Sequence, residues 1–327
     1  MKAFRYARAT SEADAVTLAS GDPTAVYIAG GTETLNLIRD GLLAPDLVVD
    51  VNAVPADGIA WGRDAVRIGA LTSMAAVAGD SRIRTRLPVL SEALSASASA
   101  QVRNMASVGG NLMQRTRCWY FRDAALPCNT RIPDSGCPAT EGENRWHAIL
   151  GGSEHCIKVH PSDLAVALTA LDATILIREA QGERRIPIGD FYRLPGSTPH
   201  VETALPHGGL IVGVEIPSGL TRSRSGYRKV RDRASFEFAL VSVAVSLDMD
   251  GDAVREARIA LGGVAPRPWR AVEAEAAVRG RRLDPDVLEA AAEAAVRGAV
   301  PREHNGFKVE LVRRTLADVL ARIGGKR

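Results

Sequence analysis

Near the N-terminus, apolar and polar residues follow the pattern of a small α/β unit. Ala25–Ile28 and Leu47–Val51 are short apolar runs of strand length, and the stretch from Thr32 to Leu43 has helical spacing that closes at Gly41. Two adjacent glycines separate the first run from the helix. The pattern therefore predicts a strand, a glycine turn, a helix and a second strand.

A second α/β region follows. Val66–Ala70 is a strand candidate, Leu90–Ala100 has the small residues of a packed helix, and Val108–Leu112 holds another pair of glycines. Further along, Pro161–Leu171 predicts a helix and Ala173–Ile177 a strand, and more strands are expected up to about position 216.

A polar break at 220–226 predicts a domain boundary, with one domain at 1–219 and another at 224–327. After the break, Val241–Met249 alternates as a half-buried strand of an antiparallel sheet does, and Arg255–Leu261 is its expected partner. Three helices are predicted to close the chain. The last has apolar residues at spacings of three and four: Val312, Leu316, Val319, Leu320 and Ile323.

The segment 113–160 follows neither the helical nor the strand period. A segment of this length without secondary structure is rare in a compact domain unless something other than an apolar core holds it. All four cysteines of the chain lie here: Cys118, Cys128, Cys137 and Cys156.

The cysteines are separated by 10, 9 and 19 positions. Four thiolates are the number that a [4Fe–4S] cluster requires. Disulfides are disfavoured because the chain shows no export signal, and a zinc site usually draws its ligands in closely spaced cysteine pairs, which are absent. Unrelated thiols would have to fall by coincidence into one window of 39 residues. Three nearby histidines are expected as neighbours or surface residues, not as ligands: His147, His155 and His160.

Composition narrows the class of protein. The 327 residues carry 41 basic and 38 acidic side chains, a net charge of +3, without a one-sided basic face, so nucleic acid is not an expected partner. No run reaches the roughly 18 apolar residues of a membrane span. The first residues lack the apolar core of a secretory signal, which predicts a cytoplasmic protein. Export to the periplasm with a signal-bearing partner stays open.

The glycine turns are candidate anion sites. Backbone N–H groups at Gly30 and Gly31 can converge on a phosphate at a helix start, although one such motif alone is more often a plain tight turn. The second turn, at Gly109 and Gly110, favours a dinucleotide pyrophosphate held between the two. The spacing is not that of a Rossmann fingerprint. Asp163, at a helix start, is either part of an N-cap or an acceptor for ligand hydroxyls.

In order along the chain, AGGTETL, SVGGNL, HPSDLAVAL, DFYRLPG and YRKVRDRASFEFALVSVA resemble the flavoprotein subunits of the xanthine dehydrogenase family. The resemblance covers nearly the whole chain. It implies an α+β fold: an FAD-binding domain of the PCMH or vanillyl-alcohol-oxidase type, made of two α/β subdomains, followed by a small domain of antiparallel sheet and helices.

The resemblance also implies the FAD contacts. The first turn is expected to wrap the pyrophosphate with Ile28, Ala29, Gly30, Gly31, Thr32, Glu33 and Thr34. The second is expected to contribute Ser107, Gly110 and Asn111, where Ser107 replaces the threonine frequent in the family. Asp163 and Lys229 are implied to bind other polar groups of FAD.

The cysteine segment is an insertion relative to most of the family. Its sequence is similar to that of the flavin subunits of periplasmic aldehyde oxidoreductases, where such an insertion carries a [4Fe–4S] cluster. The similar stretches are CWYFRD, PCN-R-P-SGC and NR-HAILG-SEHC. The β subunit of 4-hydroxybenzoyl-CoA reductase also has one. The resemblance therefore implies that the four cysteines ligate such a cluster.

The chain shows no catalytic triad or paired carboxylates, and no molybdopterin or [2Fe–2S] segment, so no catalytic residue is predicted. The resemblance implies a heterotrimer in which a molybdopterin-binding large subunit oxidises an aldehyde or heterocycle, and a [2Fe–2S] small subunit relays electrons. This chain would pass them through FAD to an external acceptor. Two alternatives remain: a 4-hydroxybenzoyl-CoA reductase β subunit, and a stand-alone flavin oxidoreductase.

Overall fold

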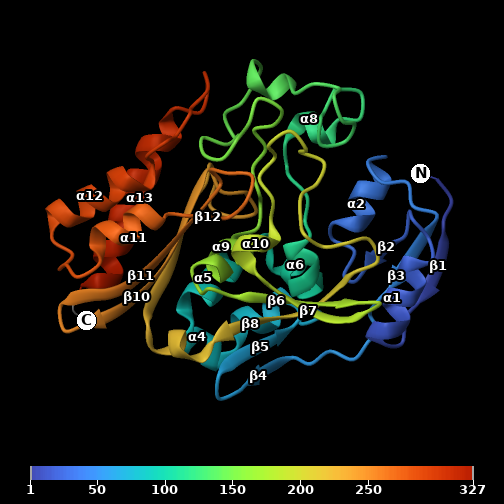
Figure 1. The fold of residues 1–327 in the computed structure, drawn as a ribbon, viewed down its shortest axis with the longest axis horizontal. Coiled ribbons are helices and arrows are strands. Elements are labelled where there is room, and N and C mark those ends of the chain that lie inside the picture. The colour runs from blue at the N-terminus through green and yellow to red at the C-terminus, as the bar shows by residue number, and fades with distance from the viewer. Residues whose placement is uncertain (1, 326–327) are drawn as a thin grey trace.

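The computed structural model describes residues 2–325 and contains three β-sheets with helices packed against them (Figure 1). The N-terminal sheet is parallel, with β3 (Leu47–Asp50) between β1 (Arg5–Arg8) and β2 (Val26–Ile28). Helices α1 (Glu12–Ser20) and α2 (Thr34–Arg39) connect these strands. All four residues of β3 are buried, as expected for the central strand of a covered parallel sheet.

The second sheet has five strands, and each neighbouring pair is antiparallel. In spatial order these are β4 (Ile59–Trp61), β5 (Ala65–Gly69), β8 (Leu210–Pro217), β6 (Thr174–Glu179) and β7 (Gly182–Pro187). Strands that precede and follow the cysteine segment in sequence thus form one sheet. The segment is therefore an insertion within a continuous domain.

Seven helices of the described chain share a hydrophobic core with this sheet or flank it. They are α3 (Met74–Gly79), α4 (Ser81–Arg86), α5 (Pro88–Ala96), α6 (Ala100–Met105), α7 (Val108–Leu112), α9 (Asp163–Thr169) and α10 (Ile188–Phe191). The single helix predicted over Leu90–Ala100 is wrong. Helix α5 ends at Ala96, Ala98 has a positive φ of 47°, and Ser99 caps a new helix, α6.

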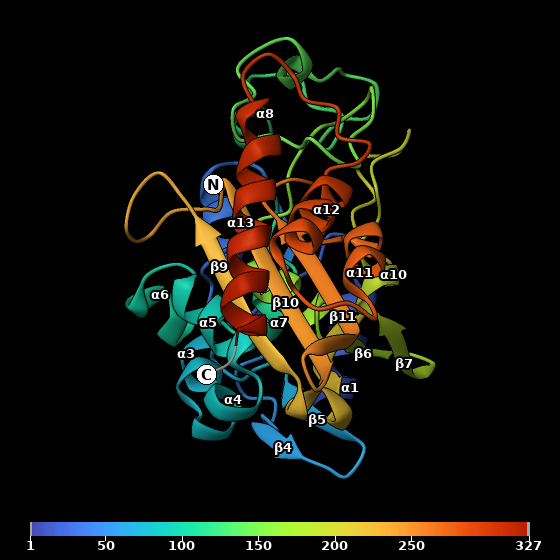
Figure 2. The same cartoon turned by 90° about the vertical axis from the view of Figure 1, so that its left-hand side faces the viewer.

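The C-terminal sheet is antiparallel, and the predicted pairing of the strand over 241–249 with that over 255–261 is confirmed. Figure 2 shows helices lying across one face of this sheet. On the other face, Tyr227, Ala244 and Ala260 join the core of the first domain. The strands are β9 (Arg224–Val230), β10 (Val241–Asp250), β11 (Ala253–Gly262) and β12 (Trp269–Arg270), and the helices α11 (Val272–Val278), α12 (Pro285–Ala295) and α13 (Phe307–Gly324).

The cysteine segment has little regular structure, as its sequence predicts. It holds one short helix, α8 (Trp119–Arg122), and a 3₁₀ turn, Pro138–Thr140, and lies at the top of Figure 1. It packs on the rest of the protein at two places: Phe121 and Cys128 contact Leu37 of α2, and Ile149 and Leu150 join the hydrophobic core of the C-terminal sheet and helices. No helix within 2–325 is long and apolar enough to cross a membrane.

Candidate functional site

The two glycine turns meet at one cavity. A Cβ on Gly30 would lie 1.8 Å from the carbonyl oxygen of Met105, so the first turn touches the backbone that leads into the second. Gly31, with a φ of 72°, and Gly110 both line this cavity, which has a volume of about 370 Å³. The structure therefore brings together the turns that the sequence paired, and the close approach of Met105 explains the glycine at position 30.

Most of the predicted FAD residues line this turn cavity. From the first turn these are Ala29, Gly30, Gly31, Thr32, Glu33 and Thr34, and from the second Ser107 and Gly110. Ile28 and Asn111 are not among the lining residues. Asn111 instead accepts a hydrogen bond from the Ser162 hydroxyl at 2.6 Å, which ties the end of α7 to the start of α9.

Glu33 has a second connection that the sequence did not reveal. Its carboxylate accepts hydrogen bonds from the Arg117 and Arg122 side chains at 2.7 and 2.6 Å and from the Arg115 backbone N–H at 3.0 Å. Burial alone would raise the pKa of Glu33, but the hydrogen bonds and charges of the two guanidinium groups outweigh it and lower the pKa. Glu33 therefore joins the turn cavity to the cysteine segment.

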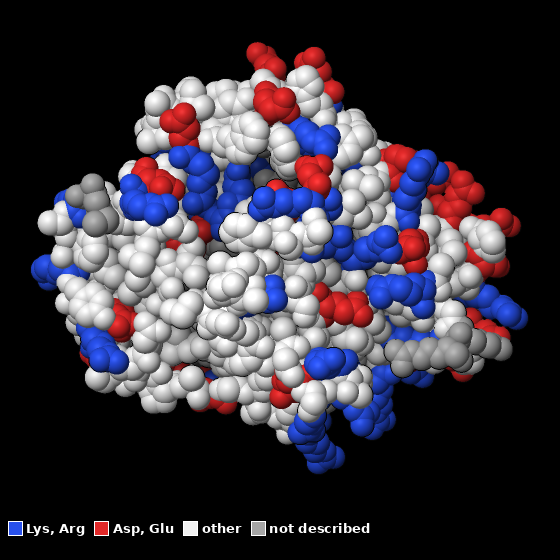
Figure 3. Space-filling model, turned by 180° about the vertical axis from the view of Figure 1, so that it is seen from behind, with Lys and Arg blue, Asp and Glu red and all other residues white. Residues whose placement is uncertain are grey.

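Two further cavities extend from the turn cavity. The middle one shares Met113 and Arg115 with it. The last, the sheet cavity, has a volume of about 250 Å³, shares Thr116 and His160 with the middle one, and reaches Gly262 of the C-terminal sheet. Figure 3 shows Lys and Arg side chains gathered around a hollow on one face of the molecule. Together the turn, middle and sheet cavities form an extended site with basic side chains around it, which suits a dinucleotide.

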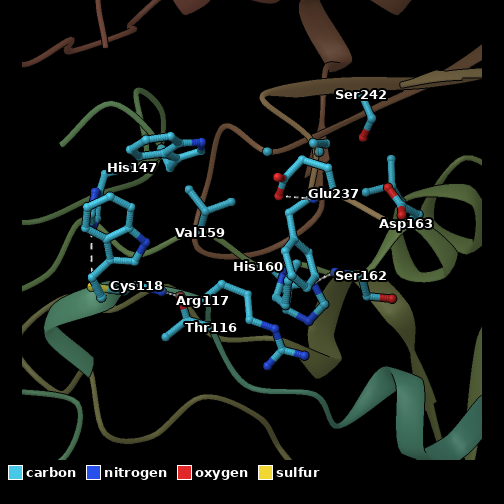
Figure 4. Close-up of a pocket in the computed structure, with 18 of the residues that line it drawn as sticks. Thr116, Arg117, Cys118, His147, Val159, His160, Ser162, Asp163, Glu237 and Ser242 are labelled. Carbon is cyan, nitrogen blue, oxygen red and sulfur yellow. Dashed lines mark hydrogen bonds between the residues drawn. The ribbon is translucent and has the colours of Figure 1, made fainter. Parts of the chain in front are cut away.

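Asp163 lines the sheet cavity (Figure 4). Three donors outside the cavity lining hold it. The Tyr227 hydroxyl, the Ser97 hydroxyl and Lys229 Nζ donate to it at 2.5, 2.9 and 2.8 Å. Burial and the Asp163 charge raise the pKa of Tyr227 well above its usual value. Lys229 is not among the lining residues, so its position supports a role in holding Asp163.

His160 lies in the wall between the middle and sheet cavities. Its ring packs on Tyr192 with centroids 4.3 Å apart, and Nδ1 accepts a hydrogen bond from the Ser162 backbone N–H at 3.3 Å. Burial lowers the pKa of His160 to about 3, so the imidazole is neutral and Nε2 carries its proton. That buried Nε2 has no partner among the described residues. An unsatisfied donor beside these cavities fits a cofactor rich in acceptors.

The four cysteines line one small cavity, with none paired in a disulfide. They lie close enough to affect one another: burial, together with the charges of Cys128 and Cys156, raises the pKa of Cys118 to about 12, and a hydrogen bond with Cys137 lowers the pKa of Cys156. Within 2–325 no group of three or more His, Cys, Asp or Glu is arranged to hold a metal ion. Cluster ligation by the cysteines therefore stays a prediction.

The cysteine cavity and the sheet cavity share a wall. Thr116, Cys118 and His147 line both. His147 Nε2 lies 3.1 Å from Cys118 Sγ, as the dashed line in Figure 4 marks. His147 is thus a buried neighbour of a cysteine, whereas His160 belongs to the wall of the other cavities. That none of the three histidines is a ligand stays a prediction.

Two family models match the chain. Residues 2–219 match the FAD binding domain in molybdopterin dehydrogenase, and residues 225–323 match the CO dehydrogenase flavoprotein C-terminal domain. The chain therefore belongs to the FAD-binding subunits of the molybdenum hydroxylase family. It is an oxidoreductase subunit that binds FAD, and the predicted α+β fold, with an FAD-binding domain followed by an antiparallel-sheet domain, is confirmed.

Individual relatives agree with this assignment. The chain is 47% identical to the aldehyde oxidoreductase FAD-binding subunit PaoB of Escherichia coli K12, over 98% of each chain. It is 27% identical to the glyceraldehyde dehydrogenase medium chain of Sulfolobus acidocaldarius, over 93% of this chain and 91% of that one. The quinoline 2-oxidoreductase structure from Pseudomonas putida 86 superposes with a TM-score of 0.77 at 25% identity, covering 99% of this chain and 98% of the other.

Proposed function

We propose that this chain is the FAD- and [4Fe–4S]-containing electron-transfer subunit of a heterotrimeric molybdenum hydroxylase that oxidises aldehydes. The 47% identity to an aldehyde oxidoreductase subunit along the whole chain supports the reaction class. The expected partners are a molybdopterin-binding large subunit, where substrate is oxidised, and a small subunit with [2Fe–2S] clusters. Electrons leave through FAD to an external acceptor.

The FAD is proposed to extend from the turn cavity to the sheet cavity. Backbone N–H groups of the turns at 28–34 and 107–111 hold the pyrophosphate, with Ser107 fixing the second turn through its hydrogen bond from Gly110 N–H at 3.1 Å. Asp163, which Lys229 holds through a hydrogen bond of 2.8 Å, presents its side chain to the hydroxyl-bearing part of the cofactor. Bound FAD supplies the ability to take up electrons singly and release them in pairs.

The cluster is proposed to be ligated by Cys118, Cys128, Cys137 and Cys156. The observation that carries this is that all the cysteines of the chain line one cavity although up to 38 positions separate them in sequence. The donor set is four sulfurs, which is the set that such a cluster binds. Thiolates around a cubane also lie farther apart than those around a single ion, whose bonds are only about 2.3 Å long.

The shared wall supports electron transfer between the two cofactor sites. Cys118 lines both the cysteine cavity and the sheet cavity, so a cluster bound to it would lie next to the proposed flavin position. Electron transfer needs such proximity and no bond rearrangement. The protein's part is to hold the two sites at a fixed separation and to keep water out between them.

The test is to express this chain with the two neighbouring reading frames and purify the complex. FAD, iron and acid-labile sulfide are then measured, with EPR of the reduced protein. We expect one FAD, four irons beyond those of the small subunit, and oxidation of aldehydes. Zinc in place of iron would refute the cluster, and an isolated monomer would refute the subunit role. Reduction of aryl-CoA substrates without aldehyde oxidation would favour the 4-hydroxybenzoyl-CoA reductase alternative.

Fractionation of the cells that express the complex would test the proposed cytoplasmic location.

A further inference from the structure

His147 occupies a position that the electron-transfer role does not by itself require. Its residue surface is 5% exposed, and its Nε2 lies 3.1 Å from Cys118 Sγ, within the distance of a hydrogen bond to sulfur. It lines both the cysteine cavity and the sheet cavity (Figure 4). A polar ring is thus buried at the wall between the two sites, with one nitrogen directed at a cysteine.

The backbone of His147 is fixed from two directions. Its N–H donates to the Asn144 carbonyl at 2.9 Å, and its own carbonyl accepts from Lys308 Nζ at 3.0 Å. Lys308 is fully buried, belongs to α13, and also donates to the Gly263 carbonyl at 2.7 Å. Residues of the C-terminal domain therefore determine where the imidazole lies relative to Cys118.

The other cysteines have no imidazole donor among the described residues, although Cys156 has two weaker contacts. Cys156 accepts from the Lys158 backbone N–H at 3.5 Å and lies 3.6 Å from the Thr130 hydroxyl. No imidazole bond to Cys128, Cys137 or Cys156 is found in the described chain. His155 also lines the cysteine cavity but is exposed, and its backbone, not its ring, makes its hydrogen bonds.

We propose that His147 is a positioning residue for the [4Fe–4S] cluster, and that it donates its Nε2–H to the Cys118 thiolate and raises the reduction potential of the cluster. The inference rests on the proposed function, because it needs the cluster to be present. A metal-bound thiolate has no proton to donate, so in the loaded protein the imidazole must be the donor. Hydrogen bonds to ligand sulfur favour the more negative, reduced state.

The experiment compares three variants in the purified heterotrimer by EPR-monitored redox titration. His147→Leu removes the donor, His147→Gln keeps an N–H donor, and His155→Leu is the matched control. We expect His147→Leu to keep its iron but to have a more negative midpoint reduction potential of the cluster. The expected change is about tenfold in the ratio of reduced to oxidised cluster at a given potential, which is 59 mV for a one-electron couple. His147→Gln should shift less, and His155→Leu should match the wild type.

An unchanged midpoint in His147→Leu, or an equal shift in His155→Leu, would overturn the inference. Pulsed EPR of the wild-type complex with ¹⁵N-labelled histidine does not depend on a variant: one weakly coupled nitrogen is expected, and its absence would also overturn the inference. Wild-type protein without the cluster iron would refute the proposed function itself. Four irons with no histidine effect would refute only the role of His147.

Discussion

Lys229 Nζ lies 2.8 Å from Asp163 Oδ2, and the two side chains are only 3% and 6% exposed. The pair connects β9 of the C-terminal sheet with the first residue of α9 in the FAD-binding domain. Because Asp163 also lines the sheet cavity, the contact between the domains and the cofactor site depend on the same carboxylate.

Lys229→Met should destabilise the protein and weaken FAD binding. Removal of one partner leaves a buried, uncompensated charge, which costs about 3–5 kcal/mol. Arg228→Ala is the control on the same strand, because the Arg228–Asp318 pair is half exposed and such pairs contribute about 0–1 kcal/mol. Urea unfolding and flavin content would be measured for both. Equal unfolding midpoints for the two variants would contradict this reading of the buried pair.

Glu33→Gln should loosen the cysteine segment in a pH-dependent way. The pKa of Glu33 is lower in the folded protein than the ordinary glutamate value of 4.5, so its ion pairs contribute stability that is fully present above that value. The contribution is lost as the pH falls through the lowered folded pKa. The stability difference between wild type and Glu33→Gln should therefore be largest near neutral pH and shrink in acid. Limited proteolysis within 113–160 and unfolding at several pH values would test this. A difference that grows in acid would contradict it.

The two glycine turns should respond differently to a larger residue. A Cβ on Gly110 would contact only the Ser107 hydroxyl, at 3.0 Å, so Gly110→Val should fold but obstruct the phosphate and lose FAD. A Cβ on Gly30 would lie 1.8 Å from the Met105 backbone, so Gly30→Val should lose stability as well as flavin. Gly189→Ala, with nothing within 4 Å, is the control. Circular dichroism and flavin absorbance separate the two effects; full FAD occupancy in Gly110→Val would contradict the assignment of that turn.

Cys128→Ser should lower the iron content and disorder the cysteine segment while FAD remains bound. Around Cys128 the apolar cluster is small, with Phe121 and Leu37 as its other buried members, so it offsets little of an ordering cost of about 1–2 kcal/mol per residue, and metal–thiolate bonds would supply the rest. Iron analysis and hydrogen exchange of peptides from 113–160 would measure both effects. The exposed Asp134→Ala in the same segment should change neither. Unchanged iron in Cys128→Ser would refute cluster ligation by this residue.

The sequence predicted the parts of this structure that local patterns report. The alternation over 241–249 predicted strand β10 and its partner, but the expected half-burial is wrong: residues 241–247 are all buried, because the second face of the sheet packs on the first domain. The paired glycines predicted two turns that meet. The break in the helix at Ala98 was missed because the small residues around it fit a helix equally well, and only the backbone shows the positive φ.

Contacts between distant residues could not be predicted in this way. Glu33 bonds to arginines more than 80 positions away, and Lys308 to a carbonyl 161 positions away. Lys308 stands in a charged stretch of α13 that resembles a solvated helix start, so nothing in its neighbours marks it as buried. The arginines at 115–122 were the one feature of the sequence that indicated an acidic side chain as a partner of the cysteine segment.

The hydrogen bond between Asn111 and Ser162 has a consequence for how such a subunit can change over evolution. It joins the residues just before and just after the cysteine segment at 2.6 Å, so the chain leaves the domain and returns to it at almost the same point. An excursion of this kind can be lengthened or removed without altering the path of the flanking helices. The part of the cysteine segment that lies away from this junction can therefore change in length between lineages while the flavin-binding scaffold keeps its path.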